Sequence, residues 1–440
     1  MDKSNLPLFI SLLLINFLSF STYGIPITFF PNIAEIRGIS DLLSGFIFAM
    51  YPLGAFFCGF IVGKMLTKWE RKRVIISSQI LMGISILIFG LSDLSQNNIV
   101  FIIVALVTRA TQGIALGSCQ TAAYAFIPEY WPDEIDFRIG LLEVTVGFGI
   151  GTGPLIGALI YSMWGYLSIY IAPGILITFF GSILAYMTLP MNKKQEEHEK
   201  TEETLSLSKT FSSRDMWYTF FVLVINYGGF TLIMPDLENK VIKIGGSPEM
   251  ASILFACNQV GYILAIAFLM IYKIKNRKGI FFVSLIFSLL SLILLGFDSF
   301  FIMSNEMKMV LIGLGTFISG IVGAFSLVPF VSESITILHS IFPDKKRHLL
   351  DNMASGLFTA AISLAEFHGP ILGGFLTQNF GFSDGCLIYS VVVFLFFIVF
   401  ATHGRGMKAM IEWGKGKRKE VKVKENEKGI EVKLLETNIL

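Results

Sequence analysis

The chain has 440 residues, of which 54% are hydrophobic and only 15% are charged, and its formal net charge is +2. A soluble globular protein carries about 25% charged residues, so this composition argues against a soluble protein. Apolar runs alternate with short charged clusters, and each run is long enough to cross about 30 Å of hydrocarbon as a helix.

Twelve apolar runs are predicted to be membrane-spanning helices, which leaves no room for a large soluble domain. They cover approximately residues 7–30, 42–63, 74–92, 99–127, 139–162, 166–190, 215–236, 249–272, 280–298, 309–338, 351–377 and 385–403. The first run contains Pro26 and Pro31 and lacks an obvious small-residue cleavage site, so it is interpreted as a helix and not as a signal peptide.

Basic residues gather in alternate connecting segments. The segment 64–73 holds five of them, and its counterpart in the second half holds Arg277 and Lys278 beside two further lysines. Lys and Arg mark cytoplasmic loops, so both termini are predicted to be cytoplasmic, in a plasma membrane or a vesicle or other endomembrane. This basicity follows the membrane topology, so it indicates a membrane-lipid environment and not nucleic-acid binding.

One pattern occurs twice along the chain, at Gly153-Pro154-Leu155-Ile156-Gly157 and at Gly369-Pro370-Ile371-Leu372-Gly373, each followed by Gly and an aromatic residue. Two related halves with a substrate site between them are typical of secondary transporters. The predicted organisation is a six-helix bundle over 1–190, a cytoplasmic linker over 191–214, a second bundle over 215–403, and a disordered cytoplasmic tail over 404–440. Six helices per half give both halves the same orientation, so the repeat is parallel.

Three segments carry a family resemblance, and a fourth supports it. Arg109-Ala110-Thr111-Gln112-Gly113 is similar to an arginine motif of proton antiporters, and Gly140 to Tyr166 is similar to the antiporter motif of the fifth helix. Ser355-Gly356-Leu357-Phe358 and the glycines that follow are similar to the eleventh helix of polyamine transporter-like proteins, as is the segment Val328-Pro329 to Glu333. The chain thus resembles the major facilitator superfamily, in particular the vesicular amine and polyamine transporter branch near the drug–proton antiporters.

The resemblance implies an all-α membrane protein of twelve helices in two parallel repeats, which moves a small-molecule substrate, with protons, and is not an enzyme. Two departures are informative. In the loop after the second helix, Gly63, Arg71 and Lys72 fit the family pattern, but Thr67 and Glu70 replace an Asp and a Gly, which argues against a charge-based latch there. Ile15 and Phe358 stand where monoamine transporters carry acids, which argues against a monoamine substrate.

Ionisable residues inside the predicted spans are the candidates for proton coupling or substrate binding, because charges in a membrane are costly and usually functional. Arg109 lies near the middle of its span and is expected to face water or a carboxylate. Glu143 is expected to face a cavity on one side of its helix, where a carboxylate withdrawn from water can exchange protons near neutrality. The alternatives are a structural ion pair for Arg109 and a shallow interfacial position for Glu143.

Three further candidates are Glu366 with His368, both deep in the span 351–377, and Glu333, which follows Pro329. Two of the three have a structural alternative: hydrogen-bonded packing for His368, and solvation at the membrane surface for Glu333. The glycines and prolines of the repeat are expected to serve helix packing and gating. They are Gly149, Gly153, Pro154, Gly157, Gly369, Pro370 and Gly373.

The predicted function is alternating-access transport, as proton-coupled antiport of an organic cation such as a polyamine or amine. The alternatives are proton-independent transport of a neutral or anionic solute, and a transporter-like receptor or scaffold. The sequence has no Gly-x-x-x-x-Gly-Lys-Ser/Thr loop for ATP and no metal-ligand spacing, so no cofactor and no metal are expected.

Overall fold

The computed structural model describes residues 5–190, 204–272, 276–301, 303–404 and 406–407, and over these residues it contains helices and no strands. The first half consists of α1 (Leu6–Ile36), α2 (Asp41–Met65), α3 (Arg71–Leu91), η2 (Ser92–Leu94), α4 (Asn98–Tyr130), α5 (Ile135–Trp164), α6 (Ser168–Leu176), the π-helical turn η3 (Ile177–Gly181) and α7 (Ser182–Thr188). The predicted linker at 191–214 and tail at 404–440 lie largely outside the described residues.

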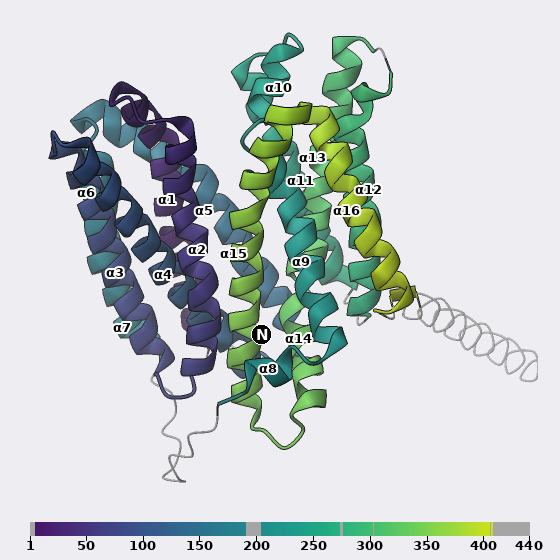
Figure 1. The fold of residues 1–440 in the computed structure, drawn as a ribbon. Coiled ribbons are helices and arrows are strands. Elements are labelled where there is room, and N and C mark those ends of the chain that lie inside the picture. The colour runs from purple at the N-terminus through teal and green to yellow at the C-terminus, as the bar shows by residue number, and fades with distance from the viewer. Residues whose placement is uncertain (1–4, 191–203, 273–275, 302, 405, 408–440) are drawn as a thin grey trace, which may run out of the picture.

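The second half repeats this arrangement, with two short helices, α8 and α10, beside the long ones (Figure 1). Its elements are α8 (Leu207–Thr210), α9 (Arg214–Ile233), α10 (Leu237–Lys243), α11 (Pro248–Tyr272), α12 (Arg277–Gly296), η4 (Phe297–Ser299), α13 (Asn305–Leu327), α14 (Phe330–Ile341), α15 (Arg347–Phe380) and α16 (Phe382–Thr402). The predicted span 309–338 is interrupted at Val328–Pro329, where α13 ends and α14 begins.

Eleven stretches of the described chain are long and apolar enough to cross a membrane. The twelfth predicted span, 351–377, lies within α15, which has 34 residues but is not among those eleven stretches. Buried polar residues such as Asp351, Asn352 and Ser355 explain the difference, because α15 packs against α2 and α4 of the first half and α9 of its own half. A helix surrounded by protein needs less apolar surface than one facing lipid, and the predicted fold class is confirmed.

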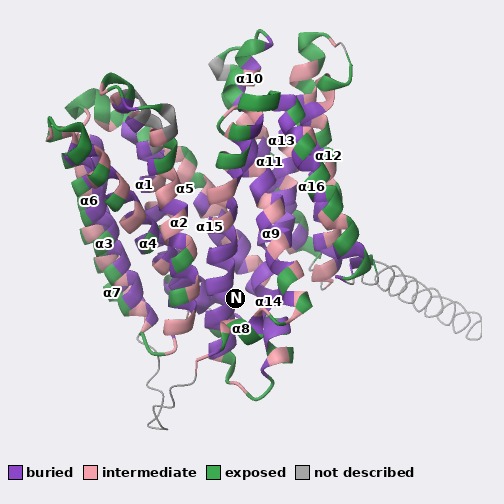
Figure 2. Cartoon of the chain, in the orientation of Figure 1, coloured by how far each residue is buried: buried purple, intermediate pink, exposed green. Residues whose placement is uncertain are grey.

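The outer surface of the bundle is apolar. Figure 2 shows buried residues on the inward sides of the helices and exposed residues on the outward sides. The exposed side chains include large apolar ones on helices of both halves, such as Leu155, Phe179, Ile271 and Leu395. Exposed apolar surface of this extent marks contact with another apolar phase, here the hydrocarbon of a membrane.

The repeated glycine pattern places the same pair of helices in contact in each half. A Cβ atom on Gly149 of α5 would lie 2.8 Å from the Phe17 carbonyl oxygen of α1, and one on Gly369 of α15 would lie 2.8 Å from the Gly228 carbonyl oxygen of α9. Gly153 and Gly373 make still closer backbone contacts one turn further on, to the carbonyl oxygens of Ser21 and Leu232. Small residues therefore let the backbones of α1 and α5 approach each other closely, and likewise those of α9 and α15.

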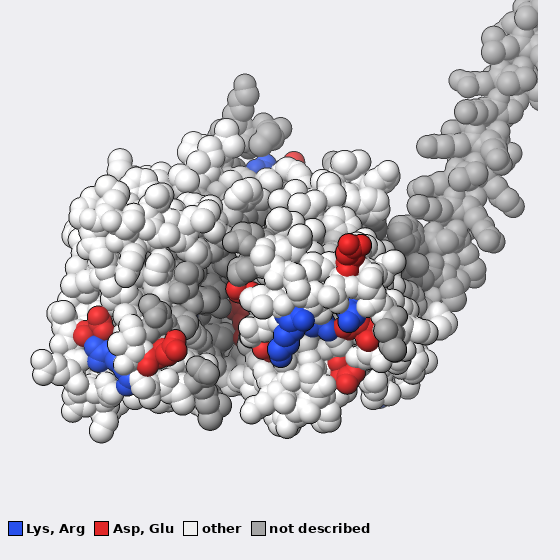
Figure 3. Space-filling view, turned by 90° about the horizontal axis from the view of Figure 1, so that it is seen from above, with Lys and Arg blue, Asp and Glu red and all other residues white. Residues whose placement is uncertain are grey.

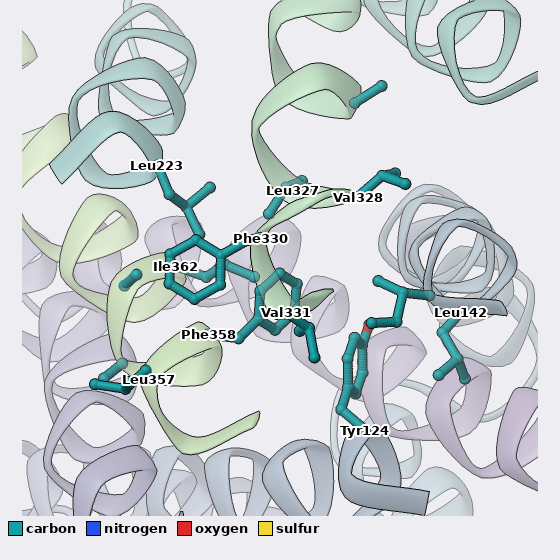
Figure 4. Packing of buried hydrophobic residues seen from close by; sticks show 14 of the residues in the cluster. Tyr124, Leu142, Leu223, Leu327, Val328, Phe330, Val331, Leu357, Phe358 and Ile362 are labelled. Atoms are coloured by element: carbon teal, nitrogen blue, oxygen red, sulfur yellow. The ribbon is translucent and has the colours of Figure 1, made fainter. Parts of the chain in front are cut away.

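The two halves touch at one end, which we call the closed end and which contains the connections 66–70 and 342–346. There α2 meets α15: a Cβ on Gly63 would lie 2.8 Å from the Gly356 Cα atom. One hydrophobic cluster includes residues of both halves at this end, among them Tyr124, Leu142, Phe330 and Phe358 (Figure 4). At the opposite, open end the surface is hollowed between the halves, and Asp or Glu atoms are visible inside the hollow (Figure 3).

Candidate functional site

A pocket between the halves is lined by residues of six helices. From the first half come Phe20 of α1, Ala55 of α2, Leu116 and Gln120 of α4, and Glu143 and Val146 of α5; from the second come Tyr227 of α9 and Ile362, Ser363 and Glu366 of α15. Two predicted site residues, Glu143 and Glu366, thus line one pocket although more than 200 positions separate them in the sequence. No Lys or Arg belongs to this lining among the described residues.

Glu143 lies near the start of α5 and is 4% exposed. The Tyr124 hydroxyl of α4 donates a hydrogen bond to its Oε1 atom, and the Tyr262 hydroxyl of α11 lies 3.5 Å from its Oε2 atom. Tyr262 belongs to the second half, so this carboxylate is held from both halves. Asn16 of α1 fixes the same turn of α5, because its amide donates to the Leu142 carbonyl oxygen at 3.0 Å.

The two faces of α5 have different surroundings, as the helical spacing predicts. Gly149 and Gly153 pack on α1, whereas a Cβ on Gly147 would meet the Gln259 side chain of α11, and one on Gly151 would meet nothing within 4 Å. Gly157 lies on the α1 face, against Phe29. The ring of Pro154 also lies against α1, at Gly24.

Glu366 lies in the middle of α15 and is partly exposed. No side chain of the described residues donates a hydrogen bond to its carboxylate or forms an ion pair with it. Tyr227 and Phe20 line the same pocket as Glu366. Each half therefore contributes one aromatic ring to the pocket. An unpaired carboxylate beside aromatic rings is suited to a cation, because a ring face attracts positive charge.

Arg109 is not part of this pocket, and the expectation that it faces water or a carboxylate is wrong within the described structure. Its side chain is 0% exposed inside the first half. Its Nη1 atom donates to Gln112 Oε1 at 3.0 Å, and its guanidinium lies 4.6 Å from the Tyr51 ring centroid and 5.3 Å from that of Phe48. Aromatic faces and an amide oxygen thus occupy the place of the expected carboxylate.

His368 and Glu333 also lie away from the pocket. The Nδ1 atom of His368 is 2.7 Å from the Leu364 carbonyl oxygen, and its Nε2 atom is 3.5 Å from the Tyr389 hydroxyl, so it packs between helices of the second half. Glu333 of α14 is buried at the closed end, with one carboxylate oxygen 3.9 Å from Lys278 Nζ. The structure therefore brings together Glu143 and Glu366 but not the other three candidates.

Polar contacts cross between the halves at the closed end. Asp136 of α5 pairs with Arg277 of α12 at 3.3 Å and accepts a hydrogen bond from Ser332 of α14. In addition, the Thr121 and Thr359 hydroxyls lie 3.0 Å apart. These contacts hold this end shut, and none of the five helices they join can move away without breaking one of them.

The loop after α2 contributes to the same closure, contrary to the expectation drawn from its missing Asp and Gly. Arg71 donates from Nε and Nη2 to the Asn352 Oδ1 atom of α15, at 3.1 and 2.6 Å, and it also pairs with Glu129 of α4. The side-chain amide of Asn352, from the opposite half, thus takes the place of the Asp that the family pattern has in this loop. Lys72 instead lies over the Tyr186 ring of its own half, 5.0 Å from the centroid.

Sequence reasoning missed several of these residues. Gln120, Tyr124, Tyr227 and Tyr262 line or support the pocket, and the only signal was a polar or phenolic group inside an otherwise apolar span. Asp136 was missed because it lies at a helix end, where charged residues are common. The matching basic pairs, Arg71-Lys72 and Arg277-Lys278 at the starts of α3 and α12, were the available signal for the closed-end contacts.

Comparison with known proteins agrees with this architecture. The MFS-type transporter SLC18B1 of Rattus norvegicus is 28% identical over 368 residues, which cover 82% of this chain and 78% of that protein, and its human counterpart is 23% identical over 372 residues, covering 84% and 79%. The multidrug resistance protein MdtG of Escherichia coli is 24% identical over 397 residues, covering 86% and 89%.

The fold agrees with a solved structure as well. The Escherichia coli fucose:proton symporter FucP superposes with a TM-score of 0.64 at 16% identity, covering 90% of this chain and 98% of that one. The family model of the Major Facilitator Superfamily matches residues 12–242 and again residues 219–429, once for each half. The chain is therefore a member of the Major Facilitator Superfamily, a multi-pass membrane transporter and not an enzyme.

Proposed function

We propose that the protein exchanges an organic cation, of the amine or polyamine class, for protons by alternating access. The observation that carries this proposal is the pocket with a carboxylate from each half and no basic residue in its described lining. Two carboxylates without a cationic partner in the pocket attract positive charge and disfavour anions. A proton and an ammonium group compete for such a site.

This competition between a proton and an ammonium group couples the movement of the cation to that of protons. An ionised Glu366 attracts an ammonium group, whereas a protonated Glu366 is neutral and releases it. Glu143 differs because the Tyr124 and Tyr262 hydroxyls already contact it, so a bound cation must displace or share these contacts. The Phe20 and Tyr227 rings add cation–π attraction for the apolar, positively charged part of a solute.

Alternation follows from the contacts at the closed end. For the pocket to open on that side, the Asp136–Arg277 pair and the Arg71–Asn352 hydrogen bonds must break. The glycine contacts between α1 and α5, and between α9 and α15, lie within one half each, so each half can rock as a unit. We place the closed end and both termini on the cytoplasmic side, which the basic loops support.

The similar proteins are compatible with this proposal. MdtG is named a multidrug resistance protein, and many drugs are apolar amines. The deviation at Ile15 and Phe358, where monoamine transporters carry acids, favours a polyamine over a monoamine for this chain.

The test is transport by the full chain in proteoliposomes with an acidic interior. Accumulation of radiolabelled spermidine is measured beside a monoamine and a drug-like cation. We expect accumulation of spermidine that collapses when a proton ionophore is added. Accumulation that is independent of the pH gradient, or the absence of uptake of every cation, contradicts the proposal and moves the search to neutral or anionic solutes.

A further inference from the structure

Arg109 belongs to a buried polar cluster that the proposed exchange does not use. The cluster consists of Arg109 and Gln112 of α4 and Tyr51 of α2, each at most 1% exposed. Arg109 Nη1 donates to Gln112 Oε1, and the guanidinium lies over the Tyr51 ring. The three side chains therefore contact one another in the interior of the first half.

Each of the three side chains has a hydrogen-bond donor without a partner. Within the described chain, Arg109 Nε, Gln112 Nε2 and the Tyr51 hydroxyl are all buried and all without a hydrogen bond. Leaving a buried donor unsatisfied costs about 1–3 kcal/mol, and more for a charged group. Because the three side chains contact one another, a single small acceptor is sufficient to serve more than one of these donors.

The charge of the cluster is also uncompensated. The two other buried arginines, Arg71 and Arg138, each pair with a glutamate, Glu129 and Glu134. Arg109 has no carboxylate within ion-pair distance among the described residues, and its remaining neighbours are rings. A guanidinium stays protonated in proteins, and an unpaired buried charge is strongly unfavourable. A water molecule would satisfy the donors, but only an anion satisfies both the donors and the charge.

We propose that Arg109, Gln112 and Tyr51 form a binding site for a small monovalent anion. The acceptor is either an inorganic halide such as chloride or the carboxylate of a small solute, since both present a compact negative charge to N–H and O–H donors. This site is separate from the carboxylate pocket and does not depend on the proposed cation exchange.

Tyr23 of α1 lies beside the site, on the side of the first half that faces the central pocket. Its ring lies against the Tyr51 ring, with centroids 4.6 Å apart, and 5.7 Å from the Arg109 guanidinium. It is partly exposed and lies one helical turn beyond Phe20, which lines the pocket.

The test is thermal unfolding of the purified full chain in detergent, with chloride replacing gluconate at constant ionic strength. A ligand that binds the folded state raises the unfolding temperature in a saturable way. We expect a saturable rise with chloride for the wild type, a dissociation constant at least fivefold weaker for Tyr51→Phe, and no rise for Arg109→Gln. Arg138→Lys is the matched control, because Arg138 already has a glutamate partner, and its chloride response should equal that of the wild type.

A second titration with formate in place of chloride identifies the anion. Saturation by chloride alone assigns an inorganic anion, and saturation by formate assigns a carboxylate. A wild type that does not respond to either anion overturns the proposal, as does a response that persists unchanged in both Tyr51→Phe and Arg109→Gln. Spermidine uptake in chloride-free gluconate liposomes distinguishes this failure from failure of the cation exchange, because that uptake tests the carboxylate pocket alone.

Discussion

Glu143 and Glu366 lie on equivalent helices of the two halves, α5 and α15, but at different depths. The repeat aligns Gly153 with Gly369, so Glu143 precedes its glycine by ten residues and Glu366 precedes its own by three. At 1.5 Å per residue, this offset places Glu366 about 10 Å nearer the open end. A solute that enters from the open end therefore reaches Glu366 before Glu143, and only Glu143 is in contact with the closed-end core through Tyr124.

Tyr124→Phe tests the support of Glu143. The substitution keeps the ring but removes the hydroxyl that donates to the carboxylate. A hydrogen bond to a charged group contributes about 1.5–3 kcal/mol, so proton-driven spermidine uptake should fall by about tenfold or more. Tyr389→Phe is the control, because the Tyr389 hydroxyl donates to the Ile225 carbonyl oxygen away from the pocket. Equal uptake by the two variants would show that Tyr124 does not support the site.

Asp136→Asn tests the contacts that shut the closed end. The substitution removes the charge paired with Arg277, and both side chains are about 30% exposed, so the loss is about 1 kcal/mol. That energy shifts the conformational equilibrium about fivefold toward the state open at this end. The readout is alkylation of Thr359→Cys, since Thr359 is fully buried between the halves, in a background with the four native cysteines replaced. An unchanged alkylation rate contradicts the assigned role of the pair.

Gly63→Ala tests the close approach of α2 and α15. The added methyl group would lie 2.8 Å from the Gly356 Cα atom, where only backbone movement can make room. We expect alkylation of Thr359→Cys to rise at least as much as for Asp136→Asn. Gly374→Ala, on α15 but with nothing within 4 Å of the added atom, should behave as the wild type. If both alanine variants respond alike, the contact between the helices does not control closure.

Lys240→Met tests a polar contact at the open end of the second half. Lys240 of α10 pairs with Asp298 of η4, and its Nζ atom donates to the Ser383 hydroxyl of α16 at 2.8 Å. Loss of the lysine ammonium group leaves the largely buried Asp298 carboxylate without its ionic partner. The free energy of unfolding should therefore fall by about 1–3 kcal/mol. Lys243→Met, on the exposed side of the same helix, is the control. Indistinguishable unfolding temperatures for the two variants would refute the stabilising role.

The sequence predicts the spans and the repeat because both depend on local properties. The length of an apolar run predicts a membrane-spanning helix. The pattern at Gly153 and Gly369 predicts two related helices that pack in the same way. The packing face of α5 also follows from helical spacing, since Gly149, Gly153 and Gly157 recur every four residues and all meet α1. Two spans are difficult: α15, whose buried polar residues make it resemble a soluble helix, and 309–338, which breaks at Val328–Pro329 into α13 and α14.

That Glu143 and Glu366 line one pocket was not predictable from one sequence. It depends on the rotation of α5 and α15 about their axes and on how the two halves dock, and no local pattern records either. Arg109 shows the same limit, because its surroundings of Tyr51, Phe48 and Gln112 come from packing between α2 and α4. The Arg71–Asn352 contact was missed because an amide performs the role that the family assigns to a carboxylate.

The central claim is that the two pocket carboxylates couple proton movement to cation movement. The most direct measurement is spermidine accumulation driven by an acidic interior, in proteoliposomes that carry the double variant Glu143→Gln with Glu366→Gln. Glu238→Gln, on the exposed side of α10, is the control for removing one acidic charge. We predict that the double variant loses gradient-driven accumulation while its unfolding temperature stays close to that of the wild type and the control keeps full uptake. A double variant that still accumulates spermidine in response to the pH gradient would contradict the claim.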